Sequence, residues 1–133
     1  MSLFLPDTNA LSRYLRGADR PLVAHFVAAF DHVRASSIVI AELEYGAVKS
    51  GVPSQRTRLD TLLSTLPTEP FTLADAAEFG RLRAFLARRG ELIGPYDLLI
   101  AAQALRLGAT IVTHNLREFS RVPGLKIADW QSL

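Results

Sequence analysis

The sequence begins with a short apolar segment that runs directly into three polar residues and then into a helical pattern. Residues 3–6 have the character of a buried strand, Asp7, Thr8 and Asn9 follow at once, and residues 8–16 are predicted to form a short helix. In an α/β protein such a junction lies at the carboxyl end of a strand, which is where open sheets gather their ligands. The segment therefore predicts an α/β fold with a functional site anchored on Asp7.

The rest of the chain continues this alternation of strands and helices. Apolar residues at helical spacing predict helices over 21–30, 38–49, 54–66, 74–89 and 96–107, and short β-prone runs predict strands over 33–37, 67–72, 109–113 and 125–128, with a turn or short helix at 114–119. Helix 96–107 is apolar nearly all round, so we expect it to be buried, and the prolines in 67–72 favour an edge strand. The pattern predicts a three-layer α/β fold with a central, mostly parallel sheet flanked by helices.

Composition narrows the classes of protein and site that this chain can form. A length of 133 residues suits a single domain, residues 1–133, and the absence of cysteine excludes disulfides, thiolate nucleophiles and cysteine-bound metals. No segment has the length and character of a membrane span or a signal peptide, so we expect a cytoplasmic protein without a membrane partner. Thirteen of the 15 basic residues are arginine. This bias reflects either a GC-rich genome or a phosphate-bearing partner such as nucleic acid.

Four of the 13 acidic residues occupy strand ends or the helices that follow strands: Asp7, Glu42, Asp97 and Glu118. In a parallel sheet these positions come out on the same edge, so the four carboxylates are expected to converge. Converging carboxylates repel one another unless some take up protons or a cation lies between them. A divalent ion such as Mg²⁺ or Mn²⁺ prefers such oxygen ligands.

Each of these acids also has an ordinary structural interpretation when it is considered alone. Asp7 can be a helix N-cap, and Asp97 can be a first-turn acid that the helix dipole favours. Glu42 and Glu118 can be solvated surface residues. The metal-site hypothesis depends on all four acting together.

Four segments, in this order and at these separations, resemble the PIN-domain ribonucleases and, more closely, the VapC-type toxins of toxin–antitoxin systems. They are Asp7-Thr8-Asn9, Ala41-Glu42-Leu43-Glu44-Tyr45-Gly46-Ala47, Gly94-Pro95-Tyr96-Asp97-Leu98-Leu99-Ile100-Ala101-Ala102 and Val112-Thr113-His114-Asn115-Leu116-Arg117-Glu118-Phe119. The resemblance covers nearly the whole chain. It departs from the family pattern at Pro6, Gln103 and His114.

The resemblance implies a set of roles and partners. It makes Asp7, Glu42 and Asp97 the acidic triad that holds Mg²⁺ or Mn²⁺, and Glu118 the fourth catalytic acid. Supporting polar positions are Thr8, Asn9, Thr113 and Asn115. It further implies an endoribonuclease that inhibits translation and growth, a small antitoxin partner, and a homodimer.

Several residues near these segments are candidates for contacts with RNA. They are Arg13, Arg16, Arg88, Arg89 and Arg117, and Tyr96, which could stack on a base or simply pack against the fold. Two other functions stay open: a catalytically inactive PIN-like module that binds RNA or protein, and a PIN nuclease of RNA processing without an antitoxin. A Mg²⁺-binding receiver domain is disfavoured, because it would need a lysine where this chain has Thr113 to Asn115.

Overall fold

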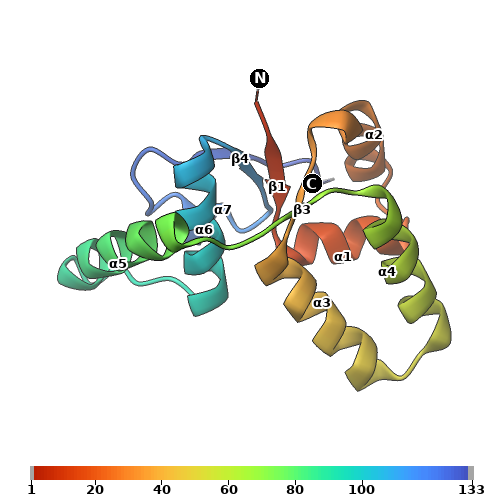
Figure 1. The fold of residues 1–133 in the computed structure, drawn as a ribbon. Helices are drawn as coiled ribbons and strands as arrows, with labels where there is room; N and C mark the ends of the chain where they lie inside the picture. Colours follow the sequence, from red (N-terminus) through yellow and green to blue (C-terminus); the bar gives the residue numbers. More distant parts are fainter. Residues whose placement is uncertain (1, 132–133) are drawn as a thin grey trace.

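Short parallel strands form the centre of the structure, a computed structural model that describes residues 2–131 (Figure 1). Strands β1 (Phe4–Pro6), β4 (Thr110–Val112) and β5 (Lys126–Ala128) pair in the order β1-β4-β5. Strands β2 (Ala35–Ser36) and β3 (Thr68–Glu69) form a second parallel pair, with β3 at its edge, and a bridge between Phe4 and Val33 joins that pair to β1. Because all the pairings are parallel, the carboxyl ends of these strands share one edge.

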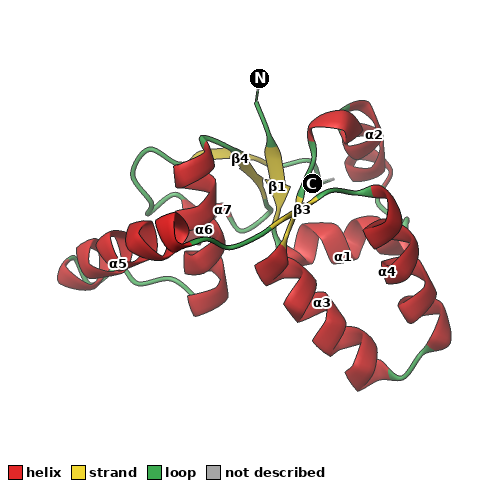
Figure 2. Ribbon diagram, viewed as in Figure 1, coloured by secondary structure: helices red, strands yellow, loops and turns green. Residues whose placement is uncertain are grey.

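Helices cover both sides of the strands (Figures 1 and 2). One side carries α1 (Thr8–Arg16), α2 (Arg20–Ala28), α3 (Ser37–Ser50) and α4 (Pro53–Thr65), and the other carries α5 (Leu73–Arg88) and α6 (Pro95–Leu107). A 3₁₀ turn (Phe30–His32) precedes β2, and the short helix α7 (Leu116–Phe119) follows β4. The predicted fold and order of elements are confirmed, with ends shifted by no more than three residues. Over residues 2–131, none of the helices combines the length and the apolar character of a membrane span.

The helices bury the apolar faces that their spacing predicts, and the buried side chains form one connected core. In α3, Val39, Leu43 and Ala47 are buried on one line, and in α6 every residue from 98 to 104 except Leu99 is buried, as expected from its apolar sequence. Trp130 packs against the rings of Phe4 and Phe26 and closes one end of this core.

A buried polar contact network holds α6 against the neighbouring strands. The side chain of Gln103 is fully buried; its Oε1 accepts from Ser36 Oγ at 2.6 Å, and its Nε2 donates to the carbonyl oxygens of Glu69 and Pro70 at 3.1 and 3.2 Å. Ser36 also caps α3. The network therefore fixes the start of α3 relative to α6, the two helices that carry Glu42 and Asp97.

Pro6 fits the strand because its missing N–H would not face β4. The ladder bonds on that side run from Thr110 N to Leu3 O at 2.8 Å and from Asp7 N to Val112 O at 2.9 Å. Alternate residues of a strand bond to opposite neighbours, so residue 6 faces the β2 side, where the pairing with β1 is a single bridge. Proline therefore removes no bond from the β1–β4 ladder.

Candidate functional site

Asp7 lies at the carboxyl end of β1 and is both a helix cap and the centre of the candidate site. Its side chain is almost fully buried; Oδ1 accepts from Ala10 N at 2.8 Å, and Oδ2 accepts from Thr113 Oγ1 at 2.6 Å. Burial raises the pKa of Asp7 above its ordinary value, although the two hydrogen bonds act to lower it. The nearby carboxylates of Glu42 and Asp129 raise it further. The N-cap and the cluster interpretations of Asp7 therefore both hold.

Glu42 reaches the same place from α3. Its Oε1 accepts from Thr8 Oγ1 at 2.5 Å, across 34 residues of sequence. The neighbouring acid Glu44 points elsewhere and pairs with Arg56 at 2.7 Å. Helical geometry thus separates two acids that are only two residues apart, and directs Glu42 alone to the site.

Asp97 and Glu118 complete the group of four acids. Burial, first of all, raises the pKa of Asp97 to about 7, and a hydrogen bond with Glu118 contributes next. The negative charges of Asp7, Glu118 and Glu42 raise it further. Each of these causes disfavours the negative charge of the Asp97 carboxylate. All four predicted acids are therefore brought within electrostatic reach of one another.

The polar residues around Glu118 and Asp7 form one chain of hydrogen bonds. Asn115 Nδ2 donates to Glu118 Oε2 at 2.8 Å, and Asn115 N donates to Thr113 Oγ1 at 2.9 Å. Since Thr113 in turn donates to Asp7, the turn after β4 links the first and fourth acids.

Three of the four acids, Asp7, Glu42 and Asp97, line a hollow of about 210 Å³, which we call the acid hollow. Its lining consists of Asp7, Thr8, Asn9, Glu42, Gly94, Pro95, Tyr96 and Asp97. A second hollow of about 430 Å³, the basic hollow, adjoins it, because Asp7 and Asn9 line both. The remaining residues of the basic hollow are Arg13, Arg16, His114, Asn115 and Gln131.

Two of the arginines predicted near the site lie elsewhere. Arg88 lines a separate hollow on α5, and Arg89 pairs with Glu91 at 2.8 Å. Both residues lie at the end of α5. They are close in sequence to the 94–102 segment, but the loop between Gly90 and Gly94 separates them from the site.

Comparison with known proteins identifies the family of this fold. A family model described as the PIN domain matches residues 4–125. The chain belongs to the PIN-domain family. It is 37% identical over 131 residues to the tRNA(fMet)-specific endonuclease VapC of Salmonella typhimurium, covering 98% of this chain and 99% of that protein. It is 44% identical over 96 residues to ribonuclease VapC2 of Rickettsia felis, covering 71% of this chain and 72% of that protein.

A solved structure shows the same likeness. The crystal structure of VapBC2 from Rickettsia felis, bound to a DNA fragment from its promoter, contains a chain that superposes with a TM-score of 0.90 at 32% identity. The match covers 97% of this chain and 99% of that one. The predicted resemblance to VapC-type PIN domains is therefore confirmed.

The donor chemistry of this PIN domain suits a hard divalent cation. The acid hollow presents carboxylate oxygens, and the raised pKa values of Asp7 and Asp97 show that positive charge would be stabilised there. Among residues 2–131, however, no three acidic or imidazole groups stand close enough together to hold an ion as they are. The residue types fit a metal site, and the carboxylates of Glu42 and Asp7 are held by the hydroxyl groups of Thr8 and Thr113.

One residue near the site escaped the sequence analysis. Asp129 directly follows β5, bonds to His114 Nδ1 at 2.9 Å and contributes to the raised pKa of Asp7. Its position after a strand is the same signal that identified Asp7, but it lies beyond the residues that the PIN family model matches.

Proposed function

We propose that this PIN domain is a Mg²⁺- or Mn²⁺-dependent endoribonuclease that acts in the cytoplasm as the toxin of a toxin–antitoxin pair. The observation that carries the proposal is the convergence of carboxylates from distant segments: Asp7, Glu42 and Asp97 line one hollow, where the pKa values of Asp7 and Asp97 are raised. Glu118 is near enough to contribute to the raised pKa of Asp97. The relatives named as ribonucleases support the choice of RNA as substrate.

In this proposal Asp7, Glu42 and Asp97 hold the ion, and Glu118 orients the attacking water. When bound, the ion would polarise a phosphoryl oxygen, acidify a water molecule and stabilise the leaving oxygen. Thr8 and Thr113 position the carboxylates of Glu42 and Asp7 through the hydrogen bonds described above. Asn115 positions Glu118, and Asn9 lies exposed at the rim that both hollows share.

The reaction would be hydrolysis by water rather than attack by the ribose 2′-hydroxyl. Water adds to the phosphorus, the bond to O3′ breaks, and the products carry a 5′-phosphate and a 3′-hydroxyl. The attacking water gives up one proton to a carboxylate, and the leaving oxygen takes one from solvent.

The same proposal includes a protein partner and a second copy of the chain. The solved neighbour is a complex of VapB and VapC from Rickettsia felis. By analogy, a small antitoxin would cover the acid hollow and present a basic side chain to its carboxylates, and the toxin would form a homodimer. Co-purification with the protein encoded beside it, followed by measurement of the mass in solution, tests both.

A second candidate is a PIN domain that binds RNA or protein without cleaving. The observation that favours it is the lack of a ready-made three-ligand arrangement in the described residues. Against it, a cluster of unpaired carboxylates destabilises the fold and has no use in a binding module. A nuclease of RNA processing without an antitoxin would show the same chemistry but no growth inhibition on expression.

The deciding experiment is RNA cleavage by the purified protein with Mg²⁺ or Mn²⁺. EDTA and Asp7→Asn should both abolish cleavage, and asparagine at this position can still cap α1. Equal cleavage by the wild type and Asp7→Asn would overturn the enzyme proposal. Sequencing of RNA 5′ ends after induced expression would identify the RNA that is cut.

A further inference from the structure

Helix α1 carries a polar stripe that starts at the acid hollow. Asn9, Arg13 and Arg16 are separated by four and then three residues, a spacing that places them on one face of a helix. At 1.5 Å per residue, the stripe extends roughly 10 Å from Asn9 to Arg16 along the helix axis. Since Asp7 caps the same helix, the stripe leads directly away from the candidate catalytic acids.

This stripe lines the basic hollow. The hollow has a volume of about 430 Å³, and its other wall contains His114 and Asn115 from the turn after β4, together with Gln131. All of its lining residues are polar or charged and, unlike those of the acid hollow, they include two arginines.

The two arginines are held differently, and both can bind an anion. Arg13 Nε donates to Asp19 Oδ2 at 2.8 Å, and Asp19 also caps α2, so the guanidinium is anchored to a fixed carboxylate. A guanidinium has five N–H donors, more than one carboxylate can accept in a single arrangement. Arg16 is exposed and makes no ion pair within the described part of the chain.

Arginines in the last turn of a helix also interact favourably with the helix dipole, which alone would explain their presence on α1. The dipole does not, however, require them to face a hollow that adjoins the acids. A strand of RNA with one phosphate at the acid hollow must carry its neighbouring phosphates past the rim. The carboxylates repel those phosphates unless basic groups compensate for them.

We propose that the basic hollow binds the RNA backbone phosphate next to the one that is cleaved, with Arg16 and Arg13 as its ligands. This inference rests on the proposed ribonuclease function. It predicts that the RNA runs from the acid hollow along α1.

The test measures binding of a short fluorescent single-stranded RNA of mixed sequence by anisotropy in EDTA, where no cleavage occurs. The proteins are the wild type, Arg16→Gln, the double variant Arg13→Gln/Arg16→Gln, and Arg88→Gln as a control. Arg88 is an exposed arginine on α5 that lines a separate hollow, so its substitution removes the same charge away from the proposed path.

We expect Arg16→Gln to weaken RNA binding about three- to tenfold, the double variant to weaken it further, and Arg88→Gln to change it less than about twofold. The slope of log K against log salt concentration should fall in magnitude by about 0.7 for the double variant, the value for one phosphate contact on a single strand. Thermal unfolding of each variant separates a folding defect from a binding defect. The Arg16→Gln variant keeps the Arg13–Asp19 pair intact.

Cleavage in Mg²⁺ provides the second measurement. If the wild type cleaves, the double variant should raise KM while kcat stays close to the wild-type value. If the wild type does not cleave but binds RNA through Arg16, the ribonuclease proposal fails, and with it the placement beside a cleaved phosphate, while phosphate binding by the basic hollow is supported. The inference is overturned if the double variant binds RNA as Arg88→Gln does. Should the double variant instead lose only its co-purifying protein partner, the hollow belongs to a protein interface and the inference is likewise overturned.

Discussion

The molecule contains two groups of buried or half-buried carboxylates whose pKa values are shifted in opposite directions. At the start of α5, Asp75 is fully buried and bonds to Arg106 at 2.5 and 2.9 Å. Burial acts to raise the pKa of Asp75, but the bonds from Arg106 and Thr72 outweigh it, so the net pKa is lowered. In the acid hollow, Asp7 and Asp97 have raised pKa values, and in residues 2–131 no arginine or lysine pairs with either.

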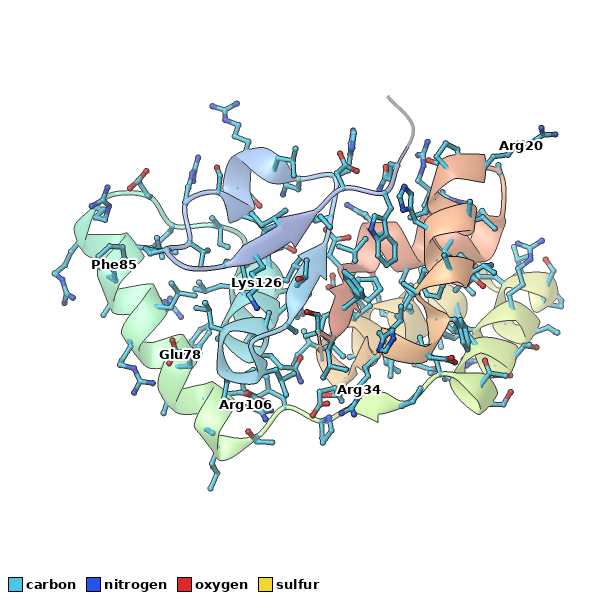
Figure 3. All side chains as sticks on the ribbon, turned by 90° about the horizontal axis from the view of Figure 1, so that it is seen from above. Arg20, Arg34, Glu78, Phe85, Arg106 and Lys126 are labelled. Atoms are coloured by element: carbon cyan, nitrogen blue, oxygen red, sulfur yellow. The ribbon has the colours of Figure 1, made fainter. Side chains whose placement is uncertain are left out.

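A second acid, near Asp75, is also paired with arginine. Glu69 lies within 2.7 Å of Arg34 and 4.0 Å of Arg106, whose side chains emerge near β3 in Figure 3. Arg106 and Asp97 lie nine residues apart on α6, so the compensated and uncompensated groups occupy opposite ends of one helix. The chain therefore supplies arginine to buried acids where stability is needed. At the acid hollow, the described residues provide no such arginine partner for Asp7 or Asp97.

The largest effect is expected from Asp97→Asn. Cleavage of RNA should fall by about 10³-fold, since the change removes a proposed metal ligand. Stability in EDTA should stay the same or increase, because one of several repelling carboxylates is gone. Activity assays and thermal unfolding of the same preparation check both. A clear loss of stability would show that the acids at the hollow stabilise the fold, contrary to the comparison.

The opposite result is expected from Asp75→Ala. The free energy of unfolding should fall by about 3 kcal/mol, because Arg106 loses its partner in a largely buried pair. Cleavage per folded molecule should hardly change. Glu91→Ala is the matched control: it breaks the exposed pair with Arg89 and should cost less than about 0.5 kcal/mol. Denaturant unfolding measures these differences. Equal losses of unfolding free energy in both variants would show that the buried pair is no more stabilising than the exposed one.

The two groups should also give stability slopes of opposite sign against pH in EDTA. The pKa of Asp97 is about 7 against an ordinary value of 3.8, so its stabilising contribution is present below 3.8 and is lost as pH rises toward 7. The pKa of Asp75 is lowered, so its contribution is present above 3.8 and is lost as pH falls through its folded pKa. Unfolding of the wild type, Asp97→Asn and Asp75→Asn from pH 3 to pH 8 checks the signs. Asp97→Asn should remove the downward slope between about pH 4 and 7 and leave the acid limb unchanged.

The smallest effect is expected from Pro6→Leu, although Pro6 directly precedes Asp7. Its N–H would face away from the β1–β4 ladder, so cleavage should remain within about twofold of wild type and the melting temperature should shift by only about 2 °C. A leucine variant that folds but loses metal-dependent cleavage would show that the proline itself sets the position of Asp7.

The sequence was informative wherever the position of a residue along an element determines its environment. Asp7 follows a strand and Asp97 lies in the first turn of a helix, and in a parallel sheet both positions lead to one edge. The helical stripe of Val39 and Leu43 predicted burial for the same reason.

Other features depend on how elements rotate against one another, and no local pattern contains that information. Arg106 and Asp75 pair across 31 residues, and Ser36 and Gln103 across 67. The departure of Arg88 and Arg89 from the site depends on the path of the loop between α5 and α6. Asp129 shows a different limit: it had the right local position, but it stood outside the motifs that drew attention to the other acids.

The buried contact between Ser36 and Gln103 has a consequence for how this chain can change during evolution. Gln103 uses its oxygen toward the hydroxyl of Ser36 and its nitrogen toward two carbonyl groups, so it needs an acceptor and a donor at once. Glutamate would bring a buried charge without a donor toward the two carbonyl groups. Leucine would remove the acceptor of the Ser36 hydroxyl and the donor to both carbonyl oxygens. Residues 36 and 103 are therefore expected to be exchanged together among descendants of this sequence. Such paired inheritance would preserve the mutual placement of α3 and α6, and with it the placement of Glu42 relative to Asp97.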